Sequence, residues 1–283
     1  MGEPRRDDLT GRETVGHEFD GIEELNTPMP RWWLITFYLT VIWGVCYTIA
    51  FPAWPMISSA TAGLLGYSTR GEVAVAIEAH ETANAALVTD LVAVDLASFD
   101  PQSDLHRYAV ARGASVFRAQ CSQCHGSGAA GSLGYPNLLD NDWLWGGTLE
   151  DIAWTVRHGI RNETDDDARW SQMPAFADIL EQEEIEALAR FLPTLANADW
   201  EGEAAVLFAD NCAACHGDRG LGDPFQGAPN LADAIWLYGG DHDSLLDTIA
   251  NARFGVMPAW GQRLTEADVR AVSTYVHSLG GGE

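Results

Sequence analysis

The chain has 283 residues, of which 47% are hydrophobic and 10% aromatic, a composition that supports packed cores and excludes a wholly disordered chain. This length allows about two domains. Sixteen arginines, with no lysine, stand against 41 acidic residues, and the resulting net charge of −25 argues against nucleic-acid binding. Such an acidic surface either serves solubility or attracts basic partners.

The first predicted element is a transmembrane helix over residues 32–54, preceded by a cytoplasmic segment at 1–31. Its 23 residues carry no charge, and at 1.5 Å per residue they reach about 34 Å, enough to cross a bilayer core of about 30 Å. Trp32 and Trp54 fit interfacial aromatic belts, and Pro52 ends the helix. A buried helix of a soluble protein and a cleaved signal peptide are the alternatives, but residues 1–31 carry eight acids, which favours an uncleaved anchor.

The charges around this helix predict its orientation. Four arginines precede it, and only Arg70 lies within about 20 residues after it. The bias places the N-terminus in the cytoplasm and everything after Trp54 outside it. The next region, 55–107, is a predicted helical linker, because apolar residues recur there at helical spacings, as at Val73, Ile77, Leu87, Leu91 and Val94.

From Gly113 onward the sequence repeats itself with a period of about 90 residues. Three motifs recur in the same order: Cys-x-x-Cys-His, then Pro-Asn-Leu with Trp-Leu-aromatic-Gly-Gly, then Met-Pro-Ala-aromatic. Each copy closes with an amphipathic helix, marked by Ile185, Leu188, Ala189 and Leu192 in the first and by Val269, Val272, Val276 and Leu279 in the second. We therefore predict one domain over 108–197 and a second over 198–283.

The motif Cys-x-x-Cys-His predicts covalent haem c attachment. On a helix its two sulfurs lie on one face, where they form thioethers with the haem vinyl groups, and the adjacent histidine faces the iron. A zinc site needs four ligands, whereas each copy offers three locally, and a thiol–disulfide redox motif expects a βαβ context. The predicted attachment residues are Cys121, Cys124, Cys212 and Cys215, and the predicted iron ligands are His125 and His216.

Met173 and Met257 are the predicted sixth ligands of the two irons. Each precedes a proline, which disfavours helix at the methionine and favours an extended loop. Histidine and methionine ligation together raise the reduction potential of haem. Pairing within a repeat is the default expectation, but two similar domains packed together can also exchange their methionine loops.

The two copies resemble class I cytochrome c domains, in which a small residue and an aromatic of the first helix pack against the last helix. At these positions stand Gly113 and Phe117 in the first copy and Ala204 and Phe208 in the second, with Phe191 and Tyr275 as the aromatic candidates on the last helices. The resemblance implies a mainly α fold: one N-terminal transmembrane helix plus two tandem class I cytochrome c domains.

Over its whole length the chain resembles the dihaem subunit of cbb3-type cytochrome c oxidases, the CcoP/FixP family. The resemblance rests on N-terminal motifs that generic dihaem cytochromes lack: His17-x-x-Asp20-Gly21-Ile22, Asn26-x-Pro28-x-Pro30-Arg31-Trp32-Trp33 and Phe51-Pro52-Ala53-Trp54-Pro55. It implies a single-pass subunit of the bacterial inner membrane with two periplasmic haem c domains. It also implies electron transfer in aerobic respiration, from a soluble cytochrome c through a monohaem subunit towards the oxygen-reducing catalytic subunit, with no catalytic centre in this chain.

Three other functions share the two haem motifs: a membrane-anchored carrier for another periplasmic redox enzyme, a dihaem peroxidase and a haem-based gas sensor. The last two need an open iron position, which the two methionines argue against. His158 is a further candidate for contact with a haem propionate, although a polar surface role is the simpler interpretation. Trp143, Trp145, Trp236 and Tyr238 are candidates both for core packing and for lining the haem pockets.

Overall fold

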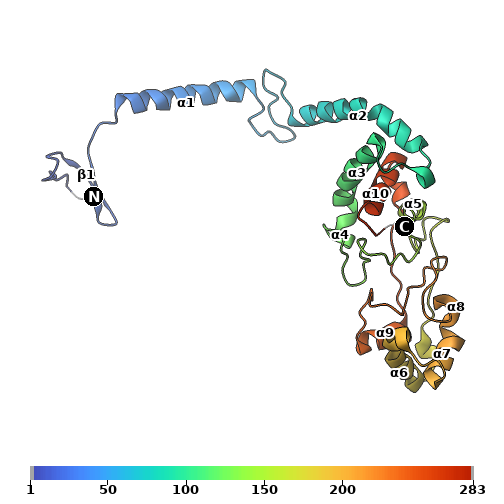
Figure 1. Cartoon of the computed structure of the whole chain (residues 1–283). Helices are drawn as coiled ribbons and strands as arrows, with labels where there is room; N and C mark the ends of the chain where they lie inside the picture. Colours follow the sequence, from blue (N-terminus) through green and yellow to red (C-terminus); the bar gives the residue numbers. More distant parts are fainter. Residues whose placement is uncertain (1–2, 282–283) are drawn as a thin grey trace. The chain divides into compact units, whose positions relative to one another are not determined.

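The computed structural model describes residues 3–281, and most of its regular structure is helical (Figure 1). The chain divides into two compact units, Met1–Thr82 and Ala83–Glu283. The second unit contains both copies of the repeat, so the geometry of the predicted haem sites belongs to this unit alone.

The first unit begins with a β-hairpin that the motif analysis did not predict. Strands β1 (Thr14–Phe19) and β2 (Ile22–Leu25) pair antiparallel, with Phe19 opposite Ile22. The turn between them is Asp20-Gly21, and both residues have positive φ, 49° and 83°. Asp-Gly is a strong signal for a two-residue hairpin turn, so the sequence contained the information.

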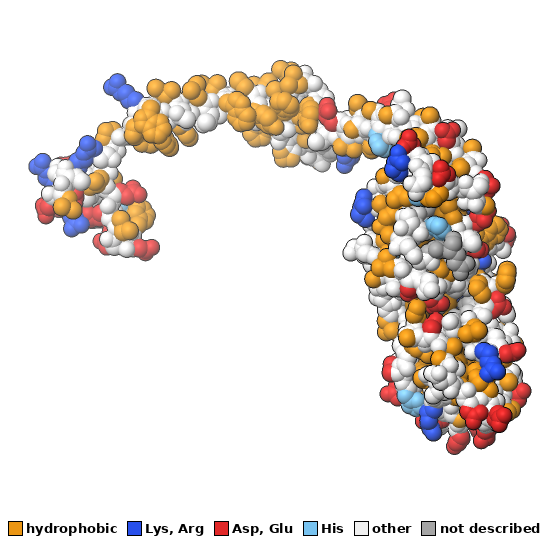
Figure 2. Space-filling view, in the orientation of Figure 1, with side chains coloured by type: hydrophobic (Ala, Val, Ile, Leu, Met, Phe, Trp, Pro, Cys, Tyr) orange, Lys and Arg blue, Asp and Glu red, His pale blue; other side chains and the backbone are white. Residues whose placement is uncertain are grey.

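Helix α1 (Arg31–Ala50) is long and apolar enough to cross a membrane, and none of its residues is buried in the structure. Figure 2 shows hydrophobic side chains gathered along it. At 1.5 Å per residue its 20 residues reach about 30 Å. The helix ends four residues before the predicted boundary at Trp54, because Pro52 drives Phe51 into an extended conformation with φ −116° and ψ 162°.

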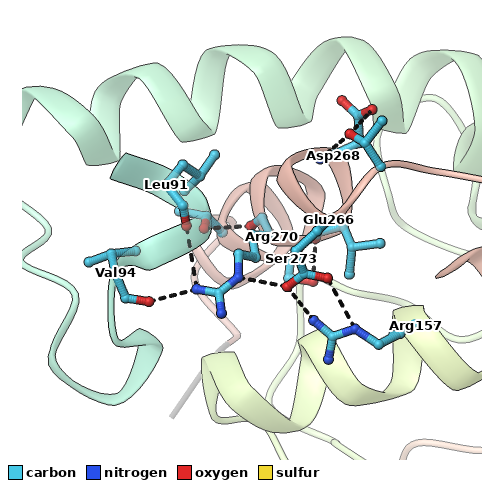
Figure 3. Close-up of polar contacts among 10 residues, drawn as sticks. Leu91, Val94, Arg157, Glu266, Asp268, Arg270 and Ser273 are labelled. Carbon is cyan, nitrogen blue, oxygen red and sulfur yellow. Dashed lines mark hydrogen bonds and ion pairs between the residues drawn. The ribbon is translucent and has the colours of Figure 1, made fainter. Parts of the chain in front are cut away.

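The predicted helical linker contains one long helix, α2 (Thr69–Ala93), followed by a short 3-10 turn, η1 (Leu96–Ser98). Its C-terminal end is held by the last helix of the chain, α10 (Glu266–His277). Arg270 donates to the carbonyl oxygen of Val94 at 2.6 Å and pairs with Glu266 at 2.7 Å (Figure 3). An arginine thus satisfies carbonyl groups that the end of a helix leaves without partners.

The rest of the second unit consists of short helices joined by loops. In chain order they are α3 (Asp104–Val116), η2 (Phe117–Cys121), α4 (Ser122–His125), α5 (Leu149–His158), η3 (Phe176–Asp178), α6 (Gln182–Phe191), η4 (Leu192–Asn197), α7 (Glu203–Asn211), α8 (Ala213–His216), α9 (His242–Asn251) and η5 (Trp260–Gln262), before α10. Helix α10 begins at the predicted cap, where the Thr265 side chain accepts a hydrogen bond from the Asp268 amide.

The two repeats exchange their last helices. Helix α10 of the second repeat packs against α3 and α5 of the first, whereas α6 of the first repeat packs against α7 and α9 of the second. We call the resulting cores the first core, built on Phe117, Ile152, Val156, Val269, Val272 and Val276, and the second core, built on Phe176, Ile185, Leu188, Phe208, Leu245 and Ile249. Each core therefore contains residues from both repeats.

The close helix contact expected at Gly113 is present, but its partner comes from the other repeat. A Cβ atom at Gly113 would lie 2.0 Å from the carbonyl oxygen of Ala271 on α10. The aromatic pairs cross in the same way: the ring centroids of Phe117 and Tyr275 are 5.4 Å apart, and those of Phe191 and Phe208 are 6.3 Å apart. The predicted packing residues are correct, and their partners are exchanged.

Candidate metal centres

Each Cys-x-x-Cys-His motif lies where the first helix of its repeat ends. In the first repeat the π-helical turn η2 and helix α4 carry Cys121, Cys124 and His125. In the second, α7 ends at Asn211 and α8 carries Cys215 and His216, with Cys212 at its N-cap. All of these cysteines are free thiols in the structure. The helix ends turn both sulfurs and the imidazole of each motif towards one cavity, described below.

Both histidines are held by a backbone carbonyl of their own repeat. The Nδ1 atom of His125 lies 3.1 Å from the Pro136 carbonyl oxygen, and that of His216 lies 3.0 Å from the Pro229 carbonyl oxygen. Because a carbonyl only accepts, Nδ1 is the donor and Nε2 keeps its lone pair for a metal. Burial lowers the pKa of His125 and of His216, which favours the neutral imidazole that binds iron.

The cysteines have the character of attachment sites rather than redox thiols. Burial raises the pKa of Cys121 to about 11 and that of Cys212 to about 11, with a smaller contribution from Cys124 and Cys215 respectively. A thiol–disulfide redox motif depends on a lowered thiol pKa. The environment therefore argues against thiol–disulfide exchange, in agreement with the absence of a βαβ unit among residues 3–281.

One continuous cavity of about 950 Å³ serves both motifs. Its walls include all four motif cysteines, both motif histidines and both candidate methionines: Cys121, Cys124, His125, Met173, Cys212, Cys215, His216 and Met257. Leu144, Ile235 and Leu237 belong to its apolar lining. The eight residues predicted from two repeats thus lie around a single hollow, at the upper end of the usual range of ligand-pocket volumes.

The methionines lie with the motif of the opposite repeat. Met257 packs against the first core together with Cys121, and Met173 packs against the second core together with Cys212. Two backbone hydrogen bonds with Ile160, each 3.0 Å long, hold Met257 in place. A Cβ atom at Gly159, where φ is +76°, would lie 2.3 Å from the Met257 carbonyl oxygen. The default expectation of pairing within a repeat is therefore not the arrangement that this packing favours.

Two arginines in the cavity wall were missed by the motif analysis. Arg253 pairs with Asp247, whereas Arg161 donates to two carbonyl oxygens, those of Ser171 at 2.7 Å and Gly255 at 2.9 Å, rather than to a carboxylate. Burial lowers the pKa of Arg161, although an arginine stays charged at neutral pH. A half-buried cation in the wall suits a group with negative charges, such as the propionates of a haem.

Of the five remaining candidates, three line the cavity and two, His158 and Trp143, do not. His158 pairs with Asp165 at 3.0 Å and is not among the described residues that line the cavity, so the polar interpretation is the better one. Trp145, Trp236 and Tyr238 line the cavity, whereas Trp143 packs on the first core and donates to the carbonyl of Gly281.

Comparison with known proteins identifies the family. The N-terminal domain of cytochrome oxidase-cbb3 FixP matches residues 11–58, and the family "Cytochrome C oxidase, cbb3-type, subunit III" matches twice, at 109–192 and 201–276. The CcoP subunit of the cbb3-type oxidase of Cereibacter sphaeroides is 55% identical over 276 residues, 95% of each chain. The FixP subunit of Sinorhizobium medicae is 46% identical over 281 residues, 98% of this chain and 97% of its own.

The chain belongs to the CcoP/FixP family of cbb3-type cytochrome c oxidase subunits. Membership makes it a dihaem electron-transfer subunit of the oxidase, with two covalently bound haem c groups. The residues present fit those groups. Each motif offers two free cysteine thiols for covalent attachment and a histidine whose Nε2 is available to iron. The same cavity wall holds two methionine side chains and two arginines. As a CcoP/FixP chain with one apolar N-terminal helix, it is anchored to a membrane.

Proposed function

We propose that each haem is held by residues of both repeats. Cys121, Cys124 and His125 bind the first haem with Met257 as the sixth ligand, and Cys212, Cys215 and His216 bind the second with Met173. The observation that carries this assignment is the packing of each methionine on the core that contains the other repeat's motif. A haem iron bound in this way accepts and releases one electron at a time.

The residues of this chain tune that exchange through ligation and charge. The carbonyls of Pro136 and Pro229 orient the two imidazoles and raise their basicity as ligands. The methionine thioethers raise the reduction potential relative to ligands that donate more strongly. Arg161 supplies positive charge in a wall of low dielectric, where it opposes the negative charge of the propionates. The apolar part of the lining, which includes Leu144, Ile235 and Leu237, lowers the dielectric around both sites.

We infer a periplasmic position for the haem domains, with residues 1–30 in the cytoplasm, because arginines cluster before α1. The partners that follow are the catalytic and monohaem subunits of the oxidase, membrane lipid around α1 and a soluble cytochrome c as electron donor. Acidic side chains are frequent on the surface of the haem unit (Figure 2). A basic donor is therefore attracted to it, and the electron-input rate is expected to fall steeply as salt concentration rises.

The direct test is purification of the tagged chain from its native membrane in mild detergent, with a reduced haem spectrum and oxygen uptake. Haem b and copper in the preparation, with cyanide-sensitive oxygen consumption, support the role in the oxidase. Two haems c per chain without oxygen uptake favour a free-standing carrier for another enzyme instead. An electron-input rate that is equal at low and high salt contradicts the attraction of a basic donor.

A further inference from the structure

The two repeats meet through a matched pair of aromatic side chains. Trp145 in the first repeat and Tyr238 in the second stand at equivalent positions, directly before a Gly-Gly pair. Both line the cavity that serves the two motifs, and Trp145 is only 7% exposed. Each ring therefore belongs to the wall of the cavity that the two proposed haem sites share.

Trp145 packs on a glycine of the second repeat. A Cβ atom at Gly227 would lie 2.1 Å from Cε2 of the indole, so only glycine leaves room for the ring there. The guanidinium carbon of Arg169 lies 5.6 Å from the ring centroid. Arg169 is itself fixed by Thr155 Oγ1 at 2.9 Å and by Asp151 at 2.8 Å. The indole is thus held by an arginine of its own repeat and a glycine of the other.

Tyr238 makes the reciprocal contact with the first repeat. A Cβ atom at Gly134 would lie 3.3 Å from Cε1 of the phenol ring, and the Gly134 amide donates to the Leu237 carbonyl at 2.8 Å. The guanidinium carbon of Arg253 lies 5.1 Å from the ring centroid. Arg253 Nε donates to Thr248 Oγ1 at 3.1 Å. Cation–aromatic contacts of this kind contribute more when water is excluded.

The two arginines use equivalent anchors although they come from different places in the repeats. Thr155 and Thr248 each stand seven residues after the N-cap of their helix, which is Thr148 for α5 and Asp241 for α9. Arg169 lies well beyond the end of α5, whereas Arg253 follows α9 almost directly. The same arrangement of threonine, arginine, aromatic ring and opposite glycine is therefore built twice by different local sequences.

A second aromatic in each loop packs on a glycine of its own repeat rather than on a glycine of the opposite repeat. A Cβ atom at Gly147 would lie 2.6 Å from Trp143, and one at Gly240 would lie 2.5 Å from Trp236. Both of these tryptophans pack on a glycine of their own repeat. Within each loop the first aromatic thus packs on its own Gly-Gly pair, and the aromatic two residues later packs on a glycine of the opposite repeat. Trp143 also donates a hydrogen bond to the Gly281 carbonyl in the second repeat, away from the cavity.

We propose that Trp145 and Tyr238 are positioning residues for electron transfer between the two haems. Their reciprocal contacts with Gly227 and Gly134 hold the two halves of the cavity in one mutual geometry. Electron transfer slows steeply as the separation of the two groups grows, so loosening this contact lowers the rate. The inference rests on the proposed pair of haem sites, and it names the residues that fix the position of one site relative to the other.

The experiment measures the rate at which an electron redistributes between the haems of the purified intact protein after pulsed partial reduction. The variants are Trp145→Leu, Tyr238→Leu and their combination, with Trp145→Phe and Tyr238→Phe as conservative replacements. Trp143→Leu is the matched control, since it removes the same side chain from the same loop together with the hydrogen bond to Gly281, but leaves the lining of the cavity unchanged. Haem content and both reduction potentials are recorded for every variant.

We expect the double Leu variant to redistribute electrons about tenfold more slowly or worse, because small errors in position are costly to transfer steps. The Phe variants and Trp143→Leu should stay within about threefold of the wild type. Gly227→Ala, which pushes on the indole without removing it, should also slow the rate. It provides the test if the double variant does not fold.

An unchanged rate in the double Leu variant and in Gly227→Ala would overturn the inference. An equal slowing in Trp143→Leu would overturn it as well, because it would indicate general loosening of the loop. The proposed function fails in a different way: the wild type itself would then lack two haems or show no redistribution between them.

Discussion

The carbonyl groups of Pro136 and Pro229 show how single residues define these sites. Proline has no backbone N–H, but its carbonyl accepts a hydrogen bond, and both carbonyls accept from Nδ1 of a motif histidine. The recurrence of Pro-Asn-Leu is visible in the sequence, whereas the hydrogen bond from each imidazole to the proline carbonyl is visible only in the structure. Arg161 does not recur in the second repeat. It stands two residues after the C-cap of α5, and the residue two positions after the C-cap of α9 is Phe254.

Removal of the charge at Arg161 is expected to lower the haem reduction potential. A cation in the cavity wall favours the reduced iron, which carries one positive charge fewer. Arg161→Gln should lower the potential of at least one haem by about 60 mV, a tenfold change in the equilibrium constant of a one-electron step. Arg161→Lys keeps the positive charge and should therefore retain most of the wild-type reduction potential. A redox titration checks this, with the exposed surface arginine Arg190→Gln as control; no difference between the Arg161→Gln variant and that control would contradict the role.

Asp142 is expected to make stability depend on pH. Burial, reinforced by Asp233 and Asp140, raises its pKa to about 6. Below the unfolded pKa of about 4 the carboxyl is protonated in both states, and its burial then costs no charge desolvation. As the pH rises through about 6 the buried carboxyl of the folded state must ionise, and the folded state loses stability. Asp142→Asn should therefore raise the free energy of unfolding at pH 8, by on the order of 1 kcal/mol after allowance for solvent screening.

Denaturant titrations of the holoprotein at pH 4 and pH 8 measure this difference. The gain should be absent at pH 4, where the native carboxyl already carries its proton. A gain of equal size at both pH values would indicate a packing effect rather than titration of Asp142.

At the scale of elements, the contact between α3 and α10 depends on the absence of a side chain at Gly113. The backbones approach so closely that α10 leaves no space for a methyl group there. In the second core Ala204 stands at the equivalent position, and the contact of α6 with α7 is carried by larger side chains such as Leu188 and Phe208. The two helix pairs are therefore equivalent in position, but only the contact of α3 with α10 requires a glycine.

Gly113→Ala is expected to destabilise the protein despite the better helix propensity of alanine. The added methyl group would overlap the Ala271 carbonyl and force α3 and α10 apart. Overpacking of this kind costs about 1–3 kcal/mol, more than the roughly 1 kcal/mol that alanine gains over glycine in a helix. Chemical denaturation measures the loss. Gly128→Ala, where a Cβ atom would meet nothing within 4 Å, is the control and should change stability by less than about 0.5 kcal/mol.

At the scale of the whole molecule, the exchange of the last helices joins the two repeats into one compact unit with shared cores. Neither core can be completed by one repeat in this arrangement, since Val269, Val272 and Val276 complete the first and Ile185 and Leu188 complete the second. Segments 159–172 and 252–256 carry the chain from one core to the other. The exchange also brings both Cys-x-x-Cys-His motifs to one cavity.

The exchange predicts which haem each methionine serves. In a Cys121→Ala/Cys124→Ala background, which keeps only the second haem, Met173→Ala should lower the reduction potential by at least about 60 mV. Met257→Ala should leave that potential unchanged. The reverse result is expected in a Cys212→Ala/Cys215→Ala background. Redox titration and the absorption band of the iron–thioether bond provide the measurements, and the opposite assignment in both backgrounds would contradict the exchange.

The sequence by itself determined the membrane helix, the two repeats and the eight candidate haem residues, because these depend on local chemistry: an uncharged run of bilayer length, fixed spacing on a helix, and proline after methionine. It did not determine which repeat supplies which methionine, since Val272 and Leu188 are equally suited to either core and hydrophobic burial is not directional. The tertiary structure supplies the packing that favours the exchanged assignment. Only the complementary fit of Gly113 to Ala271, and of Trp145 to Gly227, distinguishes the exchanged packing from pairing within a repeat.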